Sequence, residues 1–507
     1  MAIKSANFPT FPFLDDLDID QEAKSKLSIN LARTYSGNSD VLMTPMASEH
    51  TADRILSEWD KVFQDNKSLM NDVLLELESS QRSKFGPRSI ALNWKDRKHM
   101  VLDYFGKSNL VAKNLKLLPS TLRRVGLRPI SLSKAMKILK NGTNSGLPFN
   151  TRKSDVKERV LKRFEYYLDR VDPCILFTRT QEQKKTRTVW GYPIADSLNE
   201  MTYYSPLLSF QKQLHWRSAL RGPDEVNKSL THIICSAKSK GLVLVSIDFS
   251  SYDSSIDPSL ISLAGDYCKM LFQDNFSDGL NYITNRIINI GLVTPDGILR
   301  GPHGIPSGST FTNEYDSIIQ YLIANESGVI KEGLFDIQGD DGVYAIEDIG
   351  VKSLFNNFKS YGLNVNEDKS YQSTDYLIYL QNLYHIDYMK NGVIGGIYPT
   401  YRALCRICFQ ERWAKFEEYG IKGSDYYAIR AITIMENCKF HPLFESLVQL
   451  VLKFDKYRLQ TSQMGIRQYI NMISDSSGTA GILINHYSDD VKGIHNFETV
   501  KLLKRLI

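Results

Sequence analysis

The sequence has few cysteines and lacks a long apolar run. Its six cysteines are scattered through 507 residues, too sparsely for a disulfide framework, so the pattern indicates a reducing compartment. No apolar stretch approaches membrane-spanning length, and Asp15, Asp16 and Asp18 lie where a secretory signal would need its apolar core. We therefore expect a soluble, intracellular protein with no transmembrane segment.

A large excess of one charge is also absent. The chain has 62 basic and 57 acidic residues, a net charge of only +5, which excludes a simple polycation. The basic residues are unevenly distributed, with eleven Lys and Arg against six Asp and Glu between Arg152 and Arg187. This excess predicts a strip that faces phosphate, although Asp155 to Asp169 fits a solvated helical face with paired charges equally well.

Only one pair of cysteines is closely spaced, Cys405 and Cys408. A zinc site would need two more well-spaced ligands. Cys438 and His441 are distant candidates for that role. We therefore favour buried thiols over a metal site.

Two adjacent aspartates, Asp340 and Asp341, lie between two runs of strand-forming residues. The apolar and aromatic positions around them predict two short strands joined by a tight turn, with Gly339 and Gly342 at its shoulders. Neighbouring carboxylates repel one another unless a cation lies between them, and hard divalent ions prefer carboxylate oxygen. A polar turn would explain Gly-Asp-Asp by itself, so the metal interpretation depends on a second acidic pair.

Asp248 and Asp253 form this second pair. The largely apolar run 242–247 predicts a buried central strand, so Asp248 falls at its end, where side chains reach a ligand, and Asp253 lies in the following turn. Asp248 and Asp340 on adjacent strands would hold two divalent ions about 4 Å apart, the arrangement for in-line displacement at phosphorus. The two pairs together predict nucleotidyl-transfer chemistry.

Two segments that precede the acidic pairs are candidates for binding nucleic acid or nucleotide. In residues 141–149, small side chains would let amides and hydroxyls face outward toward a sugar-phosphate backbone, with an ordinary loop as the alternative. Basic and small polar residues alternate in 177–190. In a strand, Lys185 and Arg187 would project from one face toward a triphosphate, although charged edge strands also guard against aggregation.

The glycine-rich segment 301–310 leads into a helical pattern. A flexible loop before a helix N-terminus presents free amides and hydroxyls to a phosphate or ribose. Thr312 and Asp316 share one face of this helix because they are four residues apart. Helix capping by Ser307 or Thr310 is the alternative explanation.

Three further features follow the double aspartate. Lys369 lies in a predicted turn, from which it would protonate leaving pyrophosphate. Residues 377–384 predict a strand and turn that would support a primer end. The basic, apolar segment 500–507 is amphipathic, and we expect it to dock on its own domain rather than on a membrane or partner.

Taken in order, these segments resemble the viral RNA-dependent RNA polymerases over roughly residues 140–390. The resemblance rests on Ser145-Gly146-Leu147-Pro148, the strip from Lys184 to Arg187, Asp248-x4-Asp253, Ser307-Gly308-x3-Thr312, Gly339-Asp340-Asp341, Lys369, and Leu380 to Tyr384. It implies an α+β right-handed polymerase with fingers, palm and thumb, whose palm has an antiparallel sheet flanked by helices. The form Ser-Gly-Ser-x-x-Thr-x3-Asp-Ser is more similar to the partitivirus and picobirnavirus branch, whose members have segmented double-stranded RNA.

The resemblance also implies a role for each motif. Two magnesium ions, replaceable by manganese, would be held by Asp248 and Asp340 with Asp341 assisting, and Lys369 would be the general acid. The triphosphate would be gripped by Lys184, Lys185 and Arg187. The 2'-hydroxyl that distinguishes RNA from DNA would be sensed around Asp253, Ser307, Gly308, Thr312 and Asp316. Template and primer would contact Ser145, Gly146, Pro148, Leu380 and Tyr384.

Asp316 departs from the pattern of many positive-strand members, which have Asn at this position. A third carboxylate close to Asp253 costs electrostatic energy unless it is protonated, hydrogen-bonded or near a cation.

The domains implied by the resemblance are an N-terminal extension (1–70), fingers (71–205), a first part of the palm (206–258), a fingers insertion (259–300), a second part of the palm (301–390), and a thumb with C-terminal tail (391–507).

The implied function is RNA-dependent synthesis of viral RNA from nucleoside triphosphates, with release of pyrophosphate, in genome replication and transcription. Template and nascent RNA, nucleoside triphosphates and viral capsid protein would be the partners, in the virion interior and the host cytoplasm. A reverse transcriptase shares paired aspartates, but Asp248-x4-Asp253 and the Ser-Gly loop argue against it. A two-metal nuclease would not need the basic strip, and a non-catalytic RNA-binding or capsid-associated module would have no reason to keep repelling carboxylates together.

Overall fold

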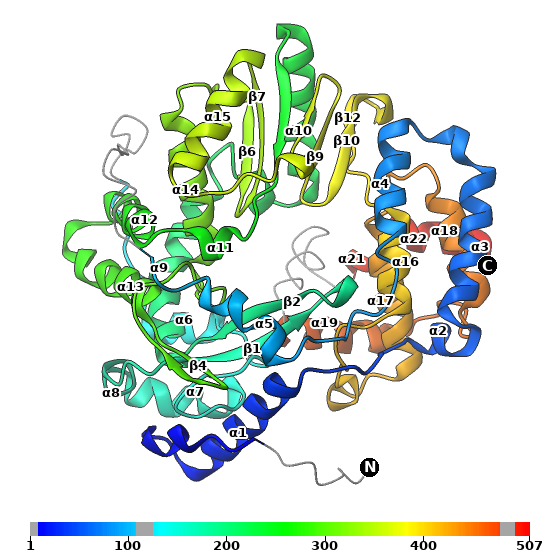
Figure 1. Cartoon of the computed structure of the whole chain (residues 1–507). Helices are drawn as coiled ribbons and strands as arrows, with labels where there is room; N and C mark the ends of the chain where they lie inside the picture. The colour runs from blue at the N-terminus through cyan, green and yellow to red at the C-terminus, as the bar shows by residue number, and fades with distance from the viewer. Residues whose placement is uncertain (1–8, 108–124, 477–491) are drawn as a thin grey trace. The chain divides into compact units, whose positions relative to one another are not determined.

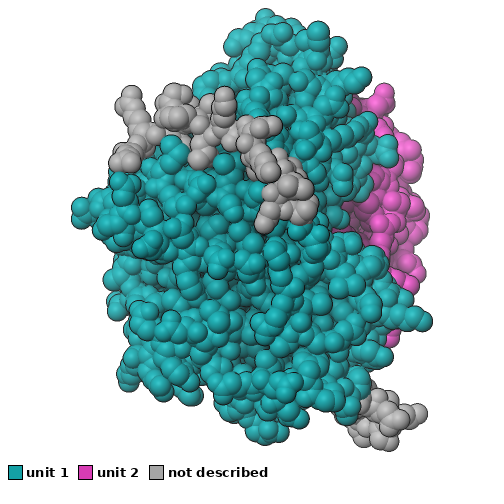
Figure 2. Space-filling model, turned by 60° about the vertical axis from the view of Figure 1, so that its left-hand side comes forward, with its two compact units in different colours: residues 1–37, 92–178, 187–380 teal, residues 38–91, 179–186, 381–507 magenta. Residues whose placement is uncertain are grey.

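The structure, a computed structural model, describes residues 9–107, 125–476 and 492–507. The chain forms two compact units. Unit 1 comprises residues 1–37, 92–178 and 187–380, and unit 2 comprises residues 38–91, 179–186 and 381–507 (Figure 2). Each unit is thus assembled from segments far apart in the sequence. The predicted boundaries of fingers, palm and thumb remain predictions.

A four-stranded sheet lies in unit 1 (Figure 1). Its strands are, in spatial order, β6 (Phe335–Gln338), β7 (Asp341–Ile346), β3 (Val243–Ile247) and β8 (Tyr371–Ser373). Each neighbouring pair is antiparallel, which confirms the predicted antiparallel sheet. The residues of β3 form an apolar run because both faces of this central strand are covered, and Leu244 and Val245, on opposite faces, are both fully buried.

Helices flank this sheet. On one face, side chains such as Ile247, Ile337 and Tyr344 join a core that includes residues of α12, α14 and α15, whereas α10 contacts β3, β6 and β7. The α-helices of unit 1 between residues 194 and 360 are α9 (Ile194–Gln211), α10 (Pro223–Lys240), α11 (Tyr252–Ser255), α12 (Pro258–Leu271), α13 (Ser277–Asn289), α14 (Thr312–Glu326) and α15 (Asp348–Ser360).

A second sheet has the order β2-β1-β4-β5. Its strands are β2 (Thr186–Gly191), β1 (Cys174–Thr180), β4 (Leu292–Thr294) and β5 (Gly297–Leu299). β1 and β4 are parallel, with Cys174 opposite Leu292, and β4 and β5 form an antiparallel hairpin. The remaining helices of unit 1 are α1 (Gln21–Ser36), α5 (Trp94–Leu102), α6 (Leu132–Ile138), α7 (Lys153–Lys162) and α8 (Phe164–Asp169), and its last strand is β9 (Tyr376–Tyr379).

Unit 2 is mainly helical. Among its described residues, the α-helices and strands are α2 (Pro45–His50), α3 (Ala52–Asp65), α4 (Asp72–Arg82), β10 (Asn382–His385), β11 (Met389–Lys390), β12 (Val393–Ile394), α16 (Thr400–Cys408), α17 (Gly423–Glu436), α18 (Phe444–Phe454), α19 (Gln463–Ser476), α21 (Lys492–His495) and α22 (Glu498–Leu506). The amphipathic α22 contacts α17 and α18 and buries Leu502 and Leu503. Its predicted docking on its own part of the chain is therefore confirmed.

The thiols of the Cys405/Cys408 pair are buried, as is that of Cys438, and all three are free. Burial raises the pKa of Cys405 to about 11, which keeps it protonated at neutral pH. His441, the fourth member of the weak zinc candidate, instead lies 2.9 Å from the buried carboxylate of Glu78. The same carboxylate accepts hydrogen bonds from Thr400 at the start of α16, so these residues form a packing network.

Candidate active site

The two acidic pairs meet at one end of the antiparallel sheet. In the register of β3 with β7, Ile247 lies opposite Gly342, so the next residues toward this end are Asp248 on one strand and Asp341 on the other. Gln338 pairs with Asp341 across the β6–β7 hairpin, which leaves Gly339 and Asp340 as its two-residue turn. The exposed Asp340 therefore stands at the tip, as the sequence predicts.

The conformation of this hairpin depends on its glycines. Gly339 has φ of +67°, in the left-handed region that glycine adopts without strain, and its N–H donates to the Ser317 hydroxyl on α14 at 2.7 Å. A Cβ on Gly342 would lie 2.4 Å from the amide nitrogen of Gln320, also on α14. The hairpin thus lies against the first turns of α14, and both glycines allow that close approach.

Asp253 and Asp316 share the electrostatic environment of the hairpin tip. Burial, and then the nearby carboxylate of Asp340, raise the pKa of Asp253 to about 6, while Arg187 acts in the opposite direction. Burial, then Asp253 and Asp340, raise the pKa of Asp316 well above its ordinary value. The structure therefore brings Asp316 close to Asp253, and favours the protonated form that the sequence argument allowed for.

A buried carboxylate accepts hydrogen bonds from the residues that follow Ser307 and Gly308. Glu200 on α9 accepts hydrogen bonds from the Ser309 hydroxyl at 2.8 Å, the Thr310 N–H at 2.7 Å and the Thr310 hydroxyl at 2.8 Å. A Cβ on Gly308 would lie only 1.7 Å from the carbonyl oxygen of Trp190, so the loop also packs tightly on β2. The Thr312 hydroxyl donates to Pro306 and Ser309 carbonyls, whereas Ser307 is exposed.

Lys369 lies in a short turn beside Asp248. This turn, Glu367–Lys369, is preceded by Asn366, whose N–H donates to the Asp248 carbonyl at 2.8 Å. The Asp248 N–H in turn donates to the hydroxyl of Ser370 at 3.2 Å. The backbone of Asp248 is thus hydrogen-bonded to Asn366 and Ser370, which lie on either side of Lys369 in the chain. The side chain of Lys369 is exposed.

The basic strip differs in part from its predicted form. Lys184 ends a short 3-10 turn and has φ of +59°, and Lys185 follows it, so neither is in β2, which begins at Thr186. Lys184, Lys185 and Arg187 are all exposed, and Thr186 is buried. The alternation expected of an extended segment is therefore present, although the strand covers only Arg187. Arg187 is also the residue that lowers the pKa of Asp253.

The segment Ser145–Pro148 does not face outward as predicted. Ser145 is fully buried, and its carbonyl accepts from the Ile194 N–H at 2.7 Å. Gly146 is also buried, with φ of +63°, and a Cβ there would lie 2.3 Å from the Tyr192 carbonyl oxygen. Pro148 is half-buried. The small residues are needed because the loop packs against the start of α9, which corrects the expectation of direct contact with RNA for Ser145 and Gly146.

A similar correction applies to Tyr384. Its side chain is only 3% exposed, and a Cβ on Gly396 would lie 2.7 Å from its hydroxyl, so it fills the interior of unit 2 instead of presenting a surface to a primer. Leu380 is half-buried and lies in the turn after β9, with φ of +48°. Its predicted contact with RNA stays a prediction.

The donor set at the end of the sheet fits a divalent metal. Asp248, Asp340 and Asp341 offer hard oxygen ligands, and Asp316 Oδ1 is buried without a hydrogen-bond partner among the described residues. Within residues 9–107, 125–476 and 492–507, no group of three His, Cys, Asp or Glu side chains is arranged to hold a metal by itself. Magnesium sites that bind phosphate substrates commonly use one or two carboxylates, with water and substrate phosphate completing the shell.

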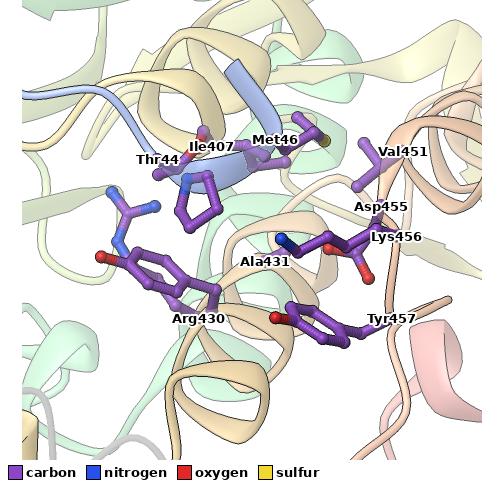
Figure 3. Close-up of a pocket in the computed structure, with 11 residues that line it drawn as sticks. Thr44, Met46, Ile407, Arg430, Ala431, Val451, Asp455, Lys456 and Tyr457 are labelled. Carbon is purple, nitrogen blue, oxygen red and sulfur yellow. The ribbon is translucent and has the colours of Figure 1, made fainter. Parts of the chain in front are cut away.

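A small pocket lies within unit 2, and none of the predicted site residues lines it (Figure 3). It is lined by residues of the segment before α2, α16, α17 and the end of α18, including Thr44, Ile407, Arg430 and Tyr457. The Arg430 guanidinium donates to the backbone carbonyls of Arg406 and Phe409. Because the Arg430 guanidinium is used in this way, we assign the pocket no ligand.

Sequence reasoning missed the buried polar residues that support the site. Glu200 lies in a mostly apolar helix, and Arg217 in an unremarkable connection after it. Both are almost completely buried, and Arg217 forms a two-bonded ion pair with Glu314, the third residue of α14. No local pattern marks these residues, because their partners are about a hundred positions away in the chain.

The comparison with known families settles the chain's relationship. The family described as viral RNA-dependent RNA polymerase matches residues 88–452, more than two thirds of the chain. The chain belongs to this family. It is thus an RNA-directed RNA polymerase, and the reverse transcriptase, nuclease and non-catalytic alternatives no longer apply.

Two relatives show which viral polymerases this chain is similar to. It is 27% identical over 519 residues to the potential RNA-dependent RNA polymerase of a human picobirnavirus (strain Human/Thailand/Hy005102/-), covering 93% of this chain and 95% of the relative. It is 27% identical over 282 residues to the RNA-directed RNA polymerase of Cryptosporidium parvum virus 1 (strain KSU-1), covering 50% and 53%. The predicted similarity to polymerases of double-stranded RNA viruses is confirmed.

Two solved structures share the fold. They are crystal structures of the RNA-dependent RNA polymerase of a human picobirnavirus and of its insertion-loop deletion mutant. The TM-scores are 0.77 for the former and 0.79 for the mutant, each at 25% identity and covering 96% of this chain and 100% of the other. The right-handed polymerase fold is therefore confirmed.

Proposed function

We propose that this polymerase joins ribonucleotides with the help of two divalent metal ions held by Asp248 and Asp340, with Asp341 assisting. The observation that carries the proposal is the convergence of these carboxylates at one end of the sheet, where Asp340 raises the pKa of Asp253. This mutual repulsion destabilises the ionised carboxylates, and a cation bound between them would relieve it. Magnesium, or manganese in its place, would stabilise the attacking and leaving oxygens.

The other residues around the tip have separable roles. The 3'-hydroxyl oxygen of the nascent RNA would bond to the α-phosphorus of the nucleoside triphosphate and lose its proton to solvent, and the bond from this phosphorus to the pyrophosphate oxygen would break. We assign Arg187 to the triphosphate, because it is exposed and within electrostatic range of Asp253. Lys369, exposed beside Asp248, would give its proton to the departing pyrophosphate.

Recognition of the ribose is assigned to residues around Asp253. Asp253 together with Ser307 and Thr312 would recognise the 2'-hydroxyl, and a protonated Asp316 would donate a hydrogen bond instead of repelling Asp253. Support for this role is electrostatic proximity. After burial, the carboxylates of Asp253 and Asp340 raise the pKa of Asp316, and the carboxylate of Asp340 raises the pKa of Asp253. Watson–Crick pairing with the template would select the base.

The biological setting is likewise proposed from the relatives. Similarity to polymerases of double-stranded RNA viruses supports a role in replication and transcription of a viral RNA genome. The partners would then be template and nascent RNA, nucleoside triphosphates and a capsid protein, in the virion interior and the host cytoplasm. None of the described helices is long and apolar enough to cross a membrane.

The test is incorporation of labelled ribonucleotides by purified protein on a homologous RNA template, with magnesium or manganese. Asp340→Asn should lower incorporation by at least about 100-fold with an unchanged melting temperature, because the exposed side chain contributes to the metal shell and not to packing. A matched control is Asp296→Asn, which removes a carboxylate from the turn of the β4–β5 hairpin. We expect this control to retain activity.

The outcomes separate the assignments. Template-dependent product from wild type and Asp296→Asn, but not from Asp340→Asn, supports the metal role. A folded Asp340→Asn protein with normal activity removes that residue from catalysis. If no variant makes product although RNA binds, the proposed conditions for synthesis are incomplete, and a capsid partner should be added to the assay.

A further inference from the structure

A buried ion pair lies beneath the hairpin that carries Asp340. Arg217 and Glu314 are both fully buried, and two parallel hydrogen bonds of 3.0 and 2.8 Å join the guanidinium to the carboxylate. Arg217 comes from the connection between α9 and α10, whereas Glu314 is in the first turn of α14. Because the dehydration of a buried ion pair costs free energy, general stability alone does not account for a pair at this position.

The pair is connected to the hairpin by amide side chains. Arg217 Nη2, which donates to Glu314 at 2.8 Å, also lies 3.3 Å from Asn313 Oδ1 and 3.4 Å from Gln338 Oε1. The Gln338 amide nitrogen donates to Asn313 Oδ1 at 2.6 Å. Gln338 is the last residue of β6, so this contact fixes the strand two positions before Asp340.

The next residue of the hairpin is fixed by the same turn of α14. The Gly339 N–H donates to the Ser317 hydroxyl at 2.7 Å, and that hydroxyl donates to the Asn313 carbonyl at 2.7 Å. On the other side, the Ile337 N–H donates to the carbonyl of Trp216, which precedes Arg217. Three consecutive residues before Asp340 are therefore held by the Trp216–Arg217 segment and by the start of α14.

We propose that Arg217, paired with Glu314, is a positioning residue for the metal-binding hairpin and acts through Asn313 and Gln338. The planar guanidinium bonds to Glu314 in a fixed geometry, and this geometry places Nη2, one of the two bonded nitrogens, beside the two amide oxygens. It thereby sets where the Gly339–Asp340 turn stands relative to Asp248. The inference rests on the proposed metal role of Asp340.

The structure supplies a matched control. Arg286 and Asp196 form another buried pair with two hydrogen bonds, of 2.7 and 2.9 Å, in the same unit. That guanidinium also donates to the carbonyl of Asp172. Arg286 lies on α13 and Asp196 at the start of α9, and neither contacts the hairpin in the described structure. Weakening this pair should lower stability without changing how metal binds.

The experiment compares Arg217→Lys and Gln338→Met with Arg286→Lys. Lysine keeps the charge but loses the two-bonded geometry, and methionine keeps the size of Gln338 but loses its hydrogen bonds. We would measure melting temperature, the magnesium dependence of incorporation, and Mn²⁺ binding by electron paramagnetic resonance, which needs no turnover. For the first two variants we expect about 10-fold more magnesium for half-maximal incorporation and a similar loss of Mn²⁺ affinity.

The control should lose melting temperature only. The proposal is overturned if Arg286→Lys shifts the metal dependence as much as Arg217→Lys does, or if Arg217→Lys and Gln338→Met lower the melting temperature with wild-type metal dependence. Asp340→Asn, measured in the same Mn²⁺ assay, separates the two levels. If it binds Mn²⁺ like wild type, the metal role fails and the positioning role with it. If only Asp340→Asn loses Mn²⁺, the positioning role alone fails.

Discussion

Glu200, the buried carboxylate under the Ser-Gly loop, should make stability depend on pH in a defined window. Burial is the largest cause that raises its pKa from 4.5 to about 7, and the hydrogen bonds from Thr310 and Ser309 oppose this change. The folded protein therefore binds this proton more tightly than the unfolded chain does. The stability that the group contributes is fully present below about pH 4.5 and is lost as the pH rises through about 7.

The size of the effect follows from the two pKa values. One pKa unit corresponds to about 1.4 kcal/mol, so ionisation of Glu200 should cost about 3 kcal/mol of stability in total, most of it between pH 5 and 8. Glu200→Gln removes the titration but keeps one oxygen to accept from Thr310. The free energy of unfolding of wild type minus that of the variant should fall by about 2–3 kcal/mol across this range.

The assay is urea unfolding of both proteins at several pH values between 5 and 8. Other titrating groups are common to both proteins and largely cancel in the difference. Parallel stability curves would refute the reasoning, because they would show that Glu200 has the same proton affinity folded and unfolded. A difference that grows with pH would mean that the carboxylate is stabilised in its charged form by the loop.

Two further predictions test other parts of the site. Asp336, buried on β6 and hydrogen-bonded to Ser229 and Tyr379, has a pKa raised from 3.8 to about 6, chiefly by burial. Urea unfolding of Asp336→Asn should show the same sign of difference, with the fall between about pH 4 and 6, and a fall at higher pH would contradict it. Gly308→Ala would place a Cβ 1.7 Å from the Trp190 carbonyl oxygen. The substitution should lower the free energy of unfolding by about 1–3 kcal/mol and lower incorporation more than 10-fold. The control Gly86→Ala, where the added Cβ would meet open space, should change neither quantity. Wild-type activity in Gly308→Ala would show that the position of the loop is unimportant for incorporation.

Local pattern was sufficient for the parts of the site that lie on regular elements. The apolar run before Asp248 and the paired runs around Asp340 predicted a buried strand and a hairpin, because burial and strand geometry impose their period on adjacent residues. The helix that carries Thr312 and Asp316 followed from its own spacing in the same way. Each of these predictions needed only neighbours within a few positions.

The same approach failed where small residues had more than one explanation. Ser145 and Gly146 predicted an outward loop, but they are small because the chain passes close to Tyr192 and the start of α9. Tyr384 predicted a surface contact but is buried. A small or aromatic residue fits a ligand contact and a tight interior equally well, and only its neighbours in space distinguish the two.

The sequence by itself determined the chemistry available to this polymerase: the two acidic pairs, their places at strand ends, the basic strip and the order of the motifs. Tertiary structure decided which of those groups meet and what holds them. Glu200 reaches a loop 109 positions away, and Arg217 reaches Glu314 97 positions away. Such pairs leave no periodic trace, because a buried polar group is satisfied by whichever distant segment the fold brings to it.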